Sequence, residues 1–501
     1  MSVLWLWDQL DTRSAIIFIV LLLLVSDYLK HRDGKNFPPG PFWVPFVGDL
    51  FSMTSDQPHL YMVKLTEKYG DVYSLRLGGS KFVIVNGCKL AKEALLTQGY
   101  ALTGRPQLAI SDRIYYKKTG VALSNGYTWK EHKRFALTTL RNFGVGKKSL
   151  ESIIMEEAKF FVEAFEEERG QPFNPHFTIN NAVSNIVCSI ILGRRFEYSD
   201  SQYRELQHLM NRGIYLEGSW WAWFYNAFPG LMKYLPGGHN ELFSSYGKIQ
   251  DFLREDIRNH KKDLDPMSPR DYIDTYLVEI EKRKNDPAAE FNDDTLCSDT
   301  FDLFVAGGET TATTLRWALL CMAQNPHIQE KVHAEIDSVL GQTHLPSMED
   351  KANMPYTEAV VHEIQRVGDI VPVNLVKMTT EDMTIGGYLI PKDTTVLINL
   401  SSVLNDKNEW ETPDTFNPGH FLTPDGKFQR KEAFMPFSAG KRPCLGEPLA
   451  RIELFLFFTC LLRKFTFRAP EGTSLTSDAI TGFTRAPMPY KICAIPRGQT
   501  A

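Results

Sequence analysis

The sequence lacks the cysteine patterns of the common metal and disulfide classes. Its seven cysteines are scattered along the chain and form no C-x-x-C pair. This absence excludes a zinc site of the usual spacing and a covalently attached c-type haem. An odd, dispersed set of cysteines is also typical of a reducing compartment rather than of a disulfide-stabilised secreted protein.

Extreme charge, internal repeats and low-complexity segments are absent as well. The formal net charge is −5 over 501 residues, so the charge balance gives no reason to expect a nucleic-acid partner. The composition is ordinary for a globular chain, with 43% hydrophobic residues, and it allows a large buried core. The function therefore has to be sought in particular motifs.

Long apolar runs are scarce, and the one that stands out lies near the N-terminus, at residues 14–26. A membrane span needs about 20 residues, so we expect residues 4–7 and 28–29 to complete this shorter run at the two interfaces. No small-residue cleavage site follows it, which favours an uncleaved anchor over a signal peptide. The positive-inside rule places the rest of the chain in the cytosol, because the run is followed by Lys30, His31, Arg32 and Lys35.

A stiff break follows the anchor at Pro38-Pro39-Gly40-Pro41. Proline fixes the backbone and cannot continue a helix, so this segment separates the anchor from the body. We therefore predict an anchor over residues 1–34, a proline-rich hinge over residues 35–41 and a single large domain over residues 42–501.

The large domain is predicted to be mostly helical with small sheets. Hydrophobic periodicity favours helices over most of it, while residues 72–85 are predicted to form a hairpin. Residues 98–127 are expected to form a long irregular segment, which in a compact domain is usually functional. Residues 370–376 are expected to enter a strand, and closing strands are expected at residues 465–467 and 490–495.

The most informative motif is Phe437-Ser-Ala-Gly440-Lys-Arg442-Pro-Cys444-Leu-Gly446, which runs directly into an apolar helix. Pro448 suits the first turn of that helix. Cys444 thus precedes a helix N-terminus and adjoins Lys441 and Arg442. Free amides, the helix dipole and two cations all favour a thiolate there. The ordinary alternative is a buried structural cysteine.

A second motif consists of residues that disfavour the helix in which it is predicted to lie. Residues 300–322 are predicted to form one apolar helix, yet its middle is Ala306-Gly-Gly-Glu309-Thr310-Thr311-Ala-Thr313-Thr314. Each interior glycine costs about 1 kcal/mol relative to alanine. Such conflicts mark functional sites, since glycine would admit a planar ligand and threonine can bond the carbonyl four residues back. A merely kinked core helix is the alternative.

Together these motifs resemble the haem-binding loop, F-x-x-G-x-R-x-C-x-G, and the oxygen-activating helix of the cytochrome P450 haem-thiolate monooxygenases. The resemblance covers residues 35–497 and implies the P450 fold, mostly α with small β-sheets, behind an N-terminal transmembrane anchor helix. Residues 42–501 would form a single catalytic haem domain. The resemblance also implies that Cys444 is the axial ligand of the haem iron and that Phe437 packs beside it. Thr310 would stabilise the activated oxygen, and Glu309 would relay protons with water.

The resemblance further implies which residues surround haem b. Trp129 and Lys133 match the family pattern W-x-x-x-R, but Lys133 replaces the arginine and supplies charge without a bidentate fork. Arg105, Lys377 and Arg442 are expected as further cofactor-binding cations, since buried propionates need partners. The residues expected to line the substrate pocket are Ile110, Ile114, Val121, Phe304, Ala306, Val371, Val373 and Phe483.

Glu363-Ile-Gln-Arg366 places opposite charges three residues apart on one helix face. Alone, this pattern usually marks an exposed pair. In the family it is a buried structural pair, joined by the arginine of P-x-R-F. Here His420 replaces that arginine, so we expect a weaker and pH-sensitive third member.

Longer sequence segments resemble those of the vertebrate microsomal family 2, subfamily J, which is the fatty-acid epoxygenase group. Among these segments are Leu-Arg-Asn-Phe-Gly and Thr-Thr-Leu-Arg-Trp-Ala-Leu-Leu. This implies an NADPH-dependent monooxygenase that uses O2 to epoxidise and hydroxylate polyunsaturated fatty acids such as arachidonic acid. Its implied partners are NADPH-cytochrome reductase, cytochrome b5 and membrane lipid. The implied subcellular location is the endoplasmic reticulum membrane, with the catalytic domain on the cytoplasmic face.

Three other functions stay open at this point. One is a broad xenobiotic or steroid monooxygenase with the same fold. Another is a haem-thiolate isomerase that works without a reductase, against which the intact Glu309-Thr310 pair argues. The last is a non-catalytic haem carrier or sensor, which would need neither an oxygen-activating helix nor a membrane anchor.

Overall fold

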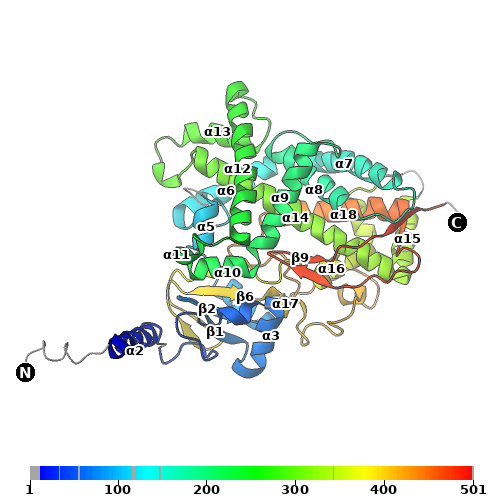
Figure 1. Cartoon of the computed structure of the whole chain (residues 1–501). Coiled ribbons are helices and arrows are strands. Elements are labelled where there is room, and N and C mark those ends of the chain that lie inside the picture. The colour runs from blue at the N-terminus through cyan, green and yellow to red at the C-terminus, as the bar shows by residue number, and fades with distance from the viewer. Residues whose placement is uncertain are drawn as a thin grey trace, which may run out of the picture.

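The computed structural model describes residues 12–32, 34–54, 57–115, 120–145, 148–341 and 344–498. Helices form the larger body of the protein, and the sheet that contains β1, β2 and β6, at residues 72–77, 80–85 and 395–398, lies below it in the view (Figure 1). The prediction of a mostly helical fold with small sheets is confirmed. The longer helices of the body are α3 (Pro58–Tyr69), α6 (Gly126–Asn142), α7 (Lys148–Glu166), α8 (His176–Ile191), α9 (Ser201–Glu217), α12 (Gly238–Asp263), α13 (Tyr272–Lys282), α14 (Asp293–Gln324), α15 (Pro326–Leu340), α16 (Pro355–Gly368) and α18 (Glu447–Lys464).

The largest sheet is assembled from distant parts of the chain in the order β1-β2-β6-β3. The predicted hairpin is present as β1 (Val72–Leu77) and β2 (Ser80–Val85), in antiparallel register from Val72 opposite Val85. β6 (Thr395–Ile398) pairs parallel to β2 and antiparallel to β3 (Lys377–Met378). Closing strands form where expected, as β7 (Phe465–Arg468) and β10 (Cys493–Pro496). The remaining hairpins are β4 (Met383–Ile385) with β5 (Tyr388–Ile390), and β8 (Ala479–Thr481) with β9 (Arg485–Pro487).

The long helix α14 runs through the middle of the body and packs against α8, α12, α16 and α18. It begins seven residues before the predicted start, because Asn292 forms a capping box with Thr295. Asn292 accepts hydrogen bonds from the backbone of Asp294 and Thr295, and Thr295 Oγ1 accepts one from Asn292 N at 3.0 Å. Burial on nearly every side then sustains the helix through its glycines and threonines.

The predicted anchor is the helix α2 (Thr12–Lys30), which leaves the body with its apolar side chains exposed (Figure 1). Among the described residues, it is the one helix long and apolar enough to cross a membrane. Its C-terminal end is held to the body, because Asp27 is buried and accepts two hydrogen bonds from Arg76, at 2.6 and 2.9 Å. The interfacial residues 4–7 predicted for the anchor lie outside the described residues.

Two local predictions are wrong. The segment 98–127 is not irregular throughout, since it contains the short helix α5 (Ala109–Ile114), which packs against α10 (Trp220–Ala227) and α12. Residues 370–376 do not form a strand, and the strand begins only at Lys377. Pro372 interrupts this segment, and proline cannot donate to a ladder. One isolated bridge, between Val373 and Asn399, remains there.

Candidate active site

A cavity of about 310 Å³ lies between α14, the start of α18 and the loop before it. Its wall is mostly apolar, but it also contains Cys444, Thr310 and several cations. The two motifs singled out from the sequence therefore face one another across a single internal space. A mostly apolar pocket with a few convergent polar groups is the usual form of a ligand site.

The loop around Cys444 is shaped by its own backbone. Gly440 has a φ of +84°, and a Cβ atom there would lie 2.1 Å from the carbonyl oxygen of Leu95, so only glycine fits. Cys444 N donates to the carbonyl of Phe437 at 3.0 Å, which closes the loop. Phe437 and the accessible surface of Cys444 both line the cavity. Gly446 needs no such freedom, since its φ is −84° and it precedes α18 with Pro448 in the first turn.

The protein alone does not make Cys444 a ready thiolate. Burial raises the pKa of the thiol, whereas the backbone amides of Gly446 and Glu447 hydrogen-bond to it and lower the pKa. The predicted help from Lys441 and Arg442 is wrong, because both side chains point elsewhere. Lys441 Nζ lies 3.8 Å above the Tyr100 ring, and the Arg442 guanidinium lies 4.0 Å above the Trp129 ring. A bound metal ion would deprotonate such a thiol outright.

The cations predicted for the cofactor gather at one end of the cavity. Arg105, Trp129, Lys133 and Arg442 line it, while Lys377 lies just behind, 1% exposed. Burial lowers the pKa of Lys377 well below its ordinary value, and the positive charges of Arg105 and Arg442 lower it further. Burial, and then the positive charge of Arg105, lower the pKa of Arg442 to about 8. None of these four cations forms an ion pair with a carboxylate of the described residues.

Four clustered cations without anions are the strongest sign that a negatively charged group belongs here. Arg442 Nε is buried without a hydrogen-bond partner among the described residues, although the guanidinium donates to Ala122 at 3.2 Å and to Ser124. Arg105 donates to the carbonyls of Leu375 and Val376, at 3.0 and 2.6 Å. A haem fits this donor set, with its propionates at the cations and its iron at the thiol.

Thr310 and Glu309 are adjacent in sequence but face different surroundings. Thr310 lines the cavity, and its hydroxyl donates to the carbonyl of Ala306 at 2.9 Å, as predicted for a threonine in this helix. Glu309 is not part of the wall, because the next helix position turns its carboxyl toward α8. There Glu309 accepts from Thr313 at 2.8 Å, and Oε2 has no partner among the described residues. Burial raises its pKa, and Arg316 and Thr313 lower it.

The glycines of α14 make a contact that we did not predict, and Gly307 also lines the cavity, where a planar ligand was expected to approach. A Cβ atom on Gly307 would lie 2.7 Å from Val187, and one on Gly308 would lie 2.6 Å from Ser184. Both neighbours belong to α8. The glycines therefore allow α8 to approach α14 closely, and the cavity is enclosed partly by this packing.

Only half of the predicted substrate-pocket residues line the cavity. Val121, Ala306, Val371 and Phe483 do. The lining prediction fails for Ile110 and Ile114, because α5 turns them into the core against its neighbouring helices. It fails for Phe304 because this residue is buried on another face of α14. It fails for Val373 because that segment packs against the hydrophobic cluster of the large sheet.

The polar residues of the wall that were not predicted include Asp302, Gln365 and Glu453. Asp302 accepts hydrogen bonds from Ala122 N at 2.9 Å and from the hydroxyl of Tyr115, and burial raises its pKa to about 7. Glu453 is the lone acid in the apolar middle of α18. An isolated carboxyl in the apolar part of a helix was the sequence signal that could have identified Glu453. Asp302 shares α14 with Asp299 and Glu309, so no such isolation marked it.

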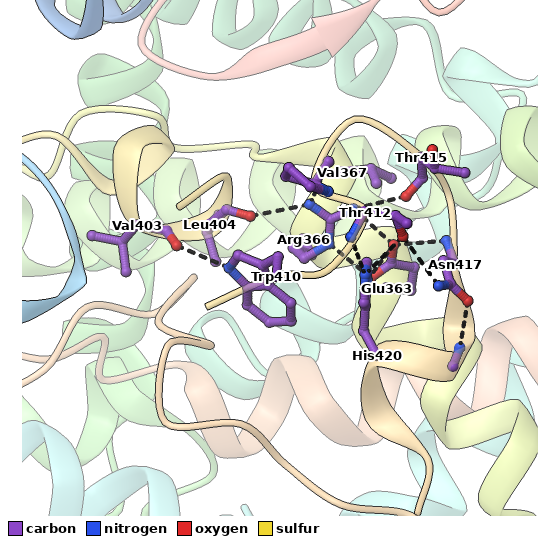
Figure 2. Close-up of polar contacts among 12 residues, drawn as sticks. Glu363, Arg366, Val367, Val403, Leu404, Trp410, Thr412, Thr415, Asn417 and His420 are labelled. Atoms are coloured by element: carbon purple, nitrogen blue, oxygen red, sulfur yellow. Dashed lines mark hydrogen bonds and ion pairs between the residues drawn. The ribbon is translucent and has the colours of Figure 1, made fainter. Parts of the chain in front are cut away.

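The structural charge cluster forms as predicted, and Figure 2 shows its contacts. Arg366 donates to both oxygens of Glu363, each at 2.8 Å, and neither residue is exposed. His420 completes the cluster at 3.2 Å from both Glu363 oxygens. Its Nε2 accepts from Thr412 N at 3.3 Å, so the ring proton lies on Nδ1 and faces Glu363. A neutral histidine thus replaces the arginine of the family pattern without leaving Glu363 unpartnered.

Comparison with known proteins agrees with this geometry. The sequence profile of the family Cytochrome P450 matches residues 38–494. Cytochrome P450 2J2 of Homo sapiens is 50% identical over 492 residues, which cover 98% of this chain and 98% of that protein. Cytochrome P450 2J1 of Oryctolagus cuniculus is 50% identical over 488 residues, with 97% of each chain covered. Cytochrome P450 2J3 of Rattus norvegicus is 48% identical over 492 residues, with 98% of each covered.

The apolar cavity, the thiol on its wall, the unpaired cations and the full-length similarity lead to one family. Its members hold haem b and use O2, with electrons from NADPH supplied through a reductase. They are oxidoreductases. The chain therefore belongs to the cytochrome P450 family and is a haem-thiolate monooxygenase.

Proposed function

We propose that this monooxygenase epoxidises and hydroxylates polyunsaturated fatty acids such as arachidonic acid. The observation that carries the proposal is the cavity wall, whose apolar residues extend from Val121 through Ala306 to Phe483. Burying an apolar chain there contributes about 25 cal/mol per Å² of surface removed from water. The similarity to cytochromes P450 2J2 and 2J1 agrees with the sequence resemblance to the subfamily J epoxygenase group, from which the fatty-acid expectation comes.

The residues that would hold haem or transfer protons then have proposed roles. Haem, when bound, supplies the activation of O2, of which one atom enters the substrate and the other leaves as water. Cys444 would hold the haem iron through its sulfur, Phe437 would pack beside it, and Thr310 would offer its hydroxyl to the cavity where protons are needed. Glu309 relays protons from behind the helix. The propionates are held by Arg105, Trp129, Lys133, Lys377 and Arg442.

The surroundings of the enzyme form a further part of the proposal. Residues 42–501 act as one catalytic domain, which receives electrons from NADPH-cytochrome reductase, with cytochrome b5 as a second donor. The α2 anchor spans the endoplasmic reticulum membrane, and the basic residues after it favour a cytoplasmic catalytic domain. Phe42 is 96% exposed and Phe46 is 44% exposed just beyond the anchor, which supports contact with lipid.

The ligand assignment is tested by the spectrum of the reduced protein with CO. Wild-type protein should show the red-shifted Soret band of a thiolate ligand, and Cys444→Ser should lose it while Cys321→Ser, a buried cysteine away from the cavity, should keep it. A normal band in Cys444→Ser would refute the ligand assignment.

The substrate assignment is tested by turnover of arachidonate with purified reductase, with and without NADPH. Epoxides and hydroxy acids should form only in the complete system. Turnover of a steroid and xenobiotic panel with no turnover of arachidonate would replace the fatty-acid proposal by broad xenobiotic oxidation.

A further inference from the structure

A buried ion pair behind the cavity wall has no role in the assignments above. It joins His132 of α6 to Asp299 of α14, and neither side chain is exposed to solvent. Nδ1 of His132 lies 2.8 Å from Oδ2 of Asp299. On the other side of the ring, Nε2 lies 3.0 Å from the carbonyl oxygen of Ala289. Charges are costly to bury, so a pair at this depth calls for a reason.

The two acceptors determine the charge of the imidazole. A neutral histidine donates a hydrogen bond from one ring nitrogen only, whereas each nitrogen of His132 faces a carboxylate or carbonyl oxygen, which accepts. Both nitrogens therefore carry a proton, and the ring is an imidazolium. Phe291 stacks on it with the ring centroids 4.5 Å apart, an arrangement that suits a cation.

The groups around His132 act on its charge in opposite directions. Burial lowers the pKa of His132, but the hydrogen bond and the charge of Asp299, the carbonyl of Ala289 and the charge of Glu290 raise it more, so the pKa lies above its ordinary value. α6 packs against η3 (Pro287–Ala289) and α13, and it meets α14 through Asp299. The further titratable and charged groups of these elements near the pair are Glu131 and Lys133 of α6, Tyr272, Tyr276, Glu279 and Arg283 of α13 and its C-terminal end, Asp286 before η3 and Asp302 of α14. Arg283 pairs with the three acids nearest to it, so Asp299 remains the partner of His132.

The second oxygen of Asp299 holds the backbone of the cavity wall. Oδ1 accepts from Val121 N at 2.7 Å, and Asp302, three residues later on α14, accepts from Ala122 N at 2.9 Å. Val121 lines the cavity. The backbone approaches α14 so closely that a Cβ atom on Gly120 would lie 2.7 Å from a carbonyl oxygen of that helix. Two carboxyl groups thus fix this part of the chain against α14.

The same stretch, residues 120–125, holds two of the cations at the end of the cavity. The carbonyl of Ala122 accepts from Nε of Arg105 at 3.0 Å and from Nη1 of Arg442 at 3.2 Å. The carbonyl of Ser124 accepts a further hydrogen bond from Arg442. A continuous line of contacts therefore runs from the ion pair through residues 120–125 to the cations.

We propose that the His132–Asp299 ion pair is a positioning device: it fixes residues 120–125 against α14 and so holds Arg105 and Arg442 at the haem end of the cavity. The hold is complete only while the imidazole is charged, because a neutral ring leaves one of its two acceptors facing a lone pair. Since the pKa of His132 is raised in the folded protein, the hold is fully present below the ordinary histidine value of about 6.5 and is lost as pH rises through the folded value. The inference rests on the proposed propionate role of the two arginines and on no particular substrate.

The first test measures hydrogen exchange at the amides of residues 120–125 in the haem-loaded, full-length protein as a function of pH. After correction for the intrinsic exchange rate, wild-type protection should fall as pH rises above about 6.5. His132→Gln should lower the protection about tenfold or more at about pH 6, because a hydrogen bond between charged groups is lost. It should also remove the part of the pH dependence that the imidazole causes. Asp299→Asn should lower the protection in the same way.

A matched control and a double variant make the test specific. His260 has the same arrangement, with Asp271 and the carbonyl of Asp256 each 2.8 Å from one of its ring nitrogens. Within the described residues, it forms no hydrogen bond to residues 120–125, so His260→Gln should leave their protection unchanged. The double variant His132→Gln with Asp299→Asn leaves no buried charge without its partner, so it should recover part of the protection that Asp299→Asn alone loses.

The second test measures the rate at which haem is lost to a scavenger at about pH 6. His132→Gln and Asp299→Asn should lose haem about tenfold faster than wild type, and His260→Gln should lose it at the wild-type rate. Wild-type protection of residues 120–125 in both single variants, in protein whose CO spectrum is normal, would overturn the inference. Lower protection with unchanged haem loss would uphold the positioning role and would instead defeat the proposed propionate site.

Discussion

Arg366 offers the sharpest test of the energetics of this fold. Arg366→Ala removes both ionic hydrogen bonds to Glu363. It also removes the donors to the backbone carbonyls of Leu404 and Thr415, at 3.1 and 2.9 Å (Figure 2), and of Pro413, at 2.8 Å. Within the described segments, Glu363 would keep only His420 and the amide of Asn417 as partners.

The expected loss follows from burial. Removing one partner of a buried pair costs about 3–5 kcal/mol, because the other charge stays buried without compensation. A loss of about 4 kcal/mol lowers the ratio of folded to unfolded protein about a thousandfold. That is a large share of the about 5–15 kcal/mol by which domains are usually stable. His420→Ala should cost less, about 1 kcal/mol, because a neutral hydrogen bond is lost and Arg366 stays in place.

Arg212→Ala supplies the matched control. Arg212 makes the same two-bond contact with Glu241, at 2.7 and 2.9 Å, but both side chains are about half exposed. Its removal should therefore cost less than about 1 kcal/mol. The free energy of unfolding from urea titrations, followed by tryptophan fluorescence, measures all three variants. Equal losses for Arg366→Ala and Arg212→Ala would refute the assignment of stability to the buried cluster.

Three further predictions follow from the cavity. Thr310→Ala should uncouple NADPH use from product and release peroxide, measured as peroxide per NADPH, and unchanged coupling would count against its role with protons. Lys377→Met removes a buried cation that has no ion-pair partner among the described residues, so it should raise the thermal stability of the haem-free protein. It should also speed the loss of haem to a scavenger, because a propionate partner is missing. Slower haem loss would contradict the propionate site. Burial raises the pKa of Asp302 to about 7 from 3.8, so the folded state holds a proton that the unfolded state releases, and stability falls as pH rises from about 4 to 7. Asp302→Asn should flatten this fall in melting temperatures taken across that range, and an unchanged slope would refute the assignment.

Local patterns predicted the elements with short-range causes. The hairpin of β1 and β2 and the start of α18 formed where turn residues and Pro448 indicated. The early start of α14 depends on a cap that the sequence also contains, at Asn292, but the apolar periodicity begins only later. A strand was predicted at residues 370–376 because valine and isoleucine favour strands. A strand also has to pair with a partner strand, and other parts of the chain provide that partner.

Side-chain direction was the larger source of error at the site. Lys441 and Arg442 adjoin Cys444 in sequence, yet they turn toward Tyr100 and Trp129 because aromatic rings and carbonyls there accept them. Glu309 adjoins Thr310, yet one helix step rotates its carboxyl out of the cavity. Adjacency along the chain therefore did not determine which groups share a space.

By itself, the sequence determined the family, the anchor, the Cys444 loop and the threonine-rich helix, because a motif of consecutive residues identifies each of them. Only the tertiary structure decided which cations form the unpaired cluster, why α14 needs its glycines and that Glu453 faces the cavity. Those features depend on close approach between α8, α14, α16 and α18, which are distant in the chain. Burial also sets the pKa values of Asp302, Lys377 and Glu453, and burial is a property of the packed protein rather than of any residue.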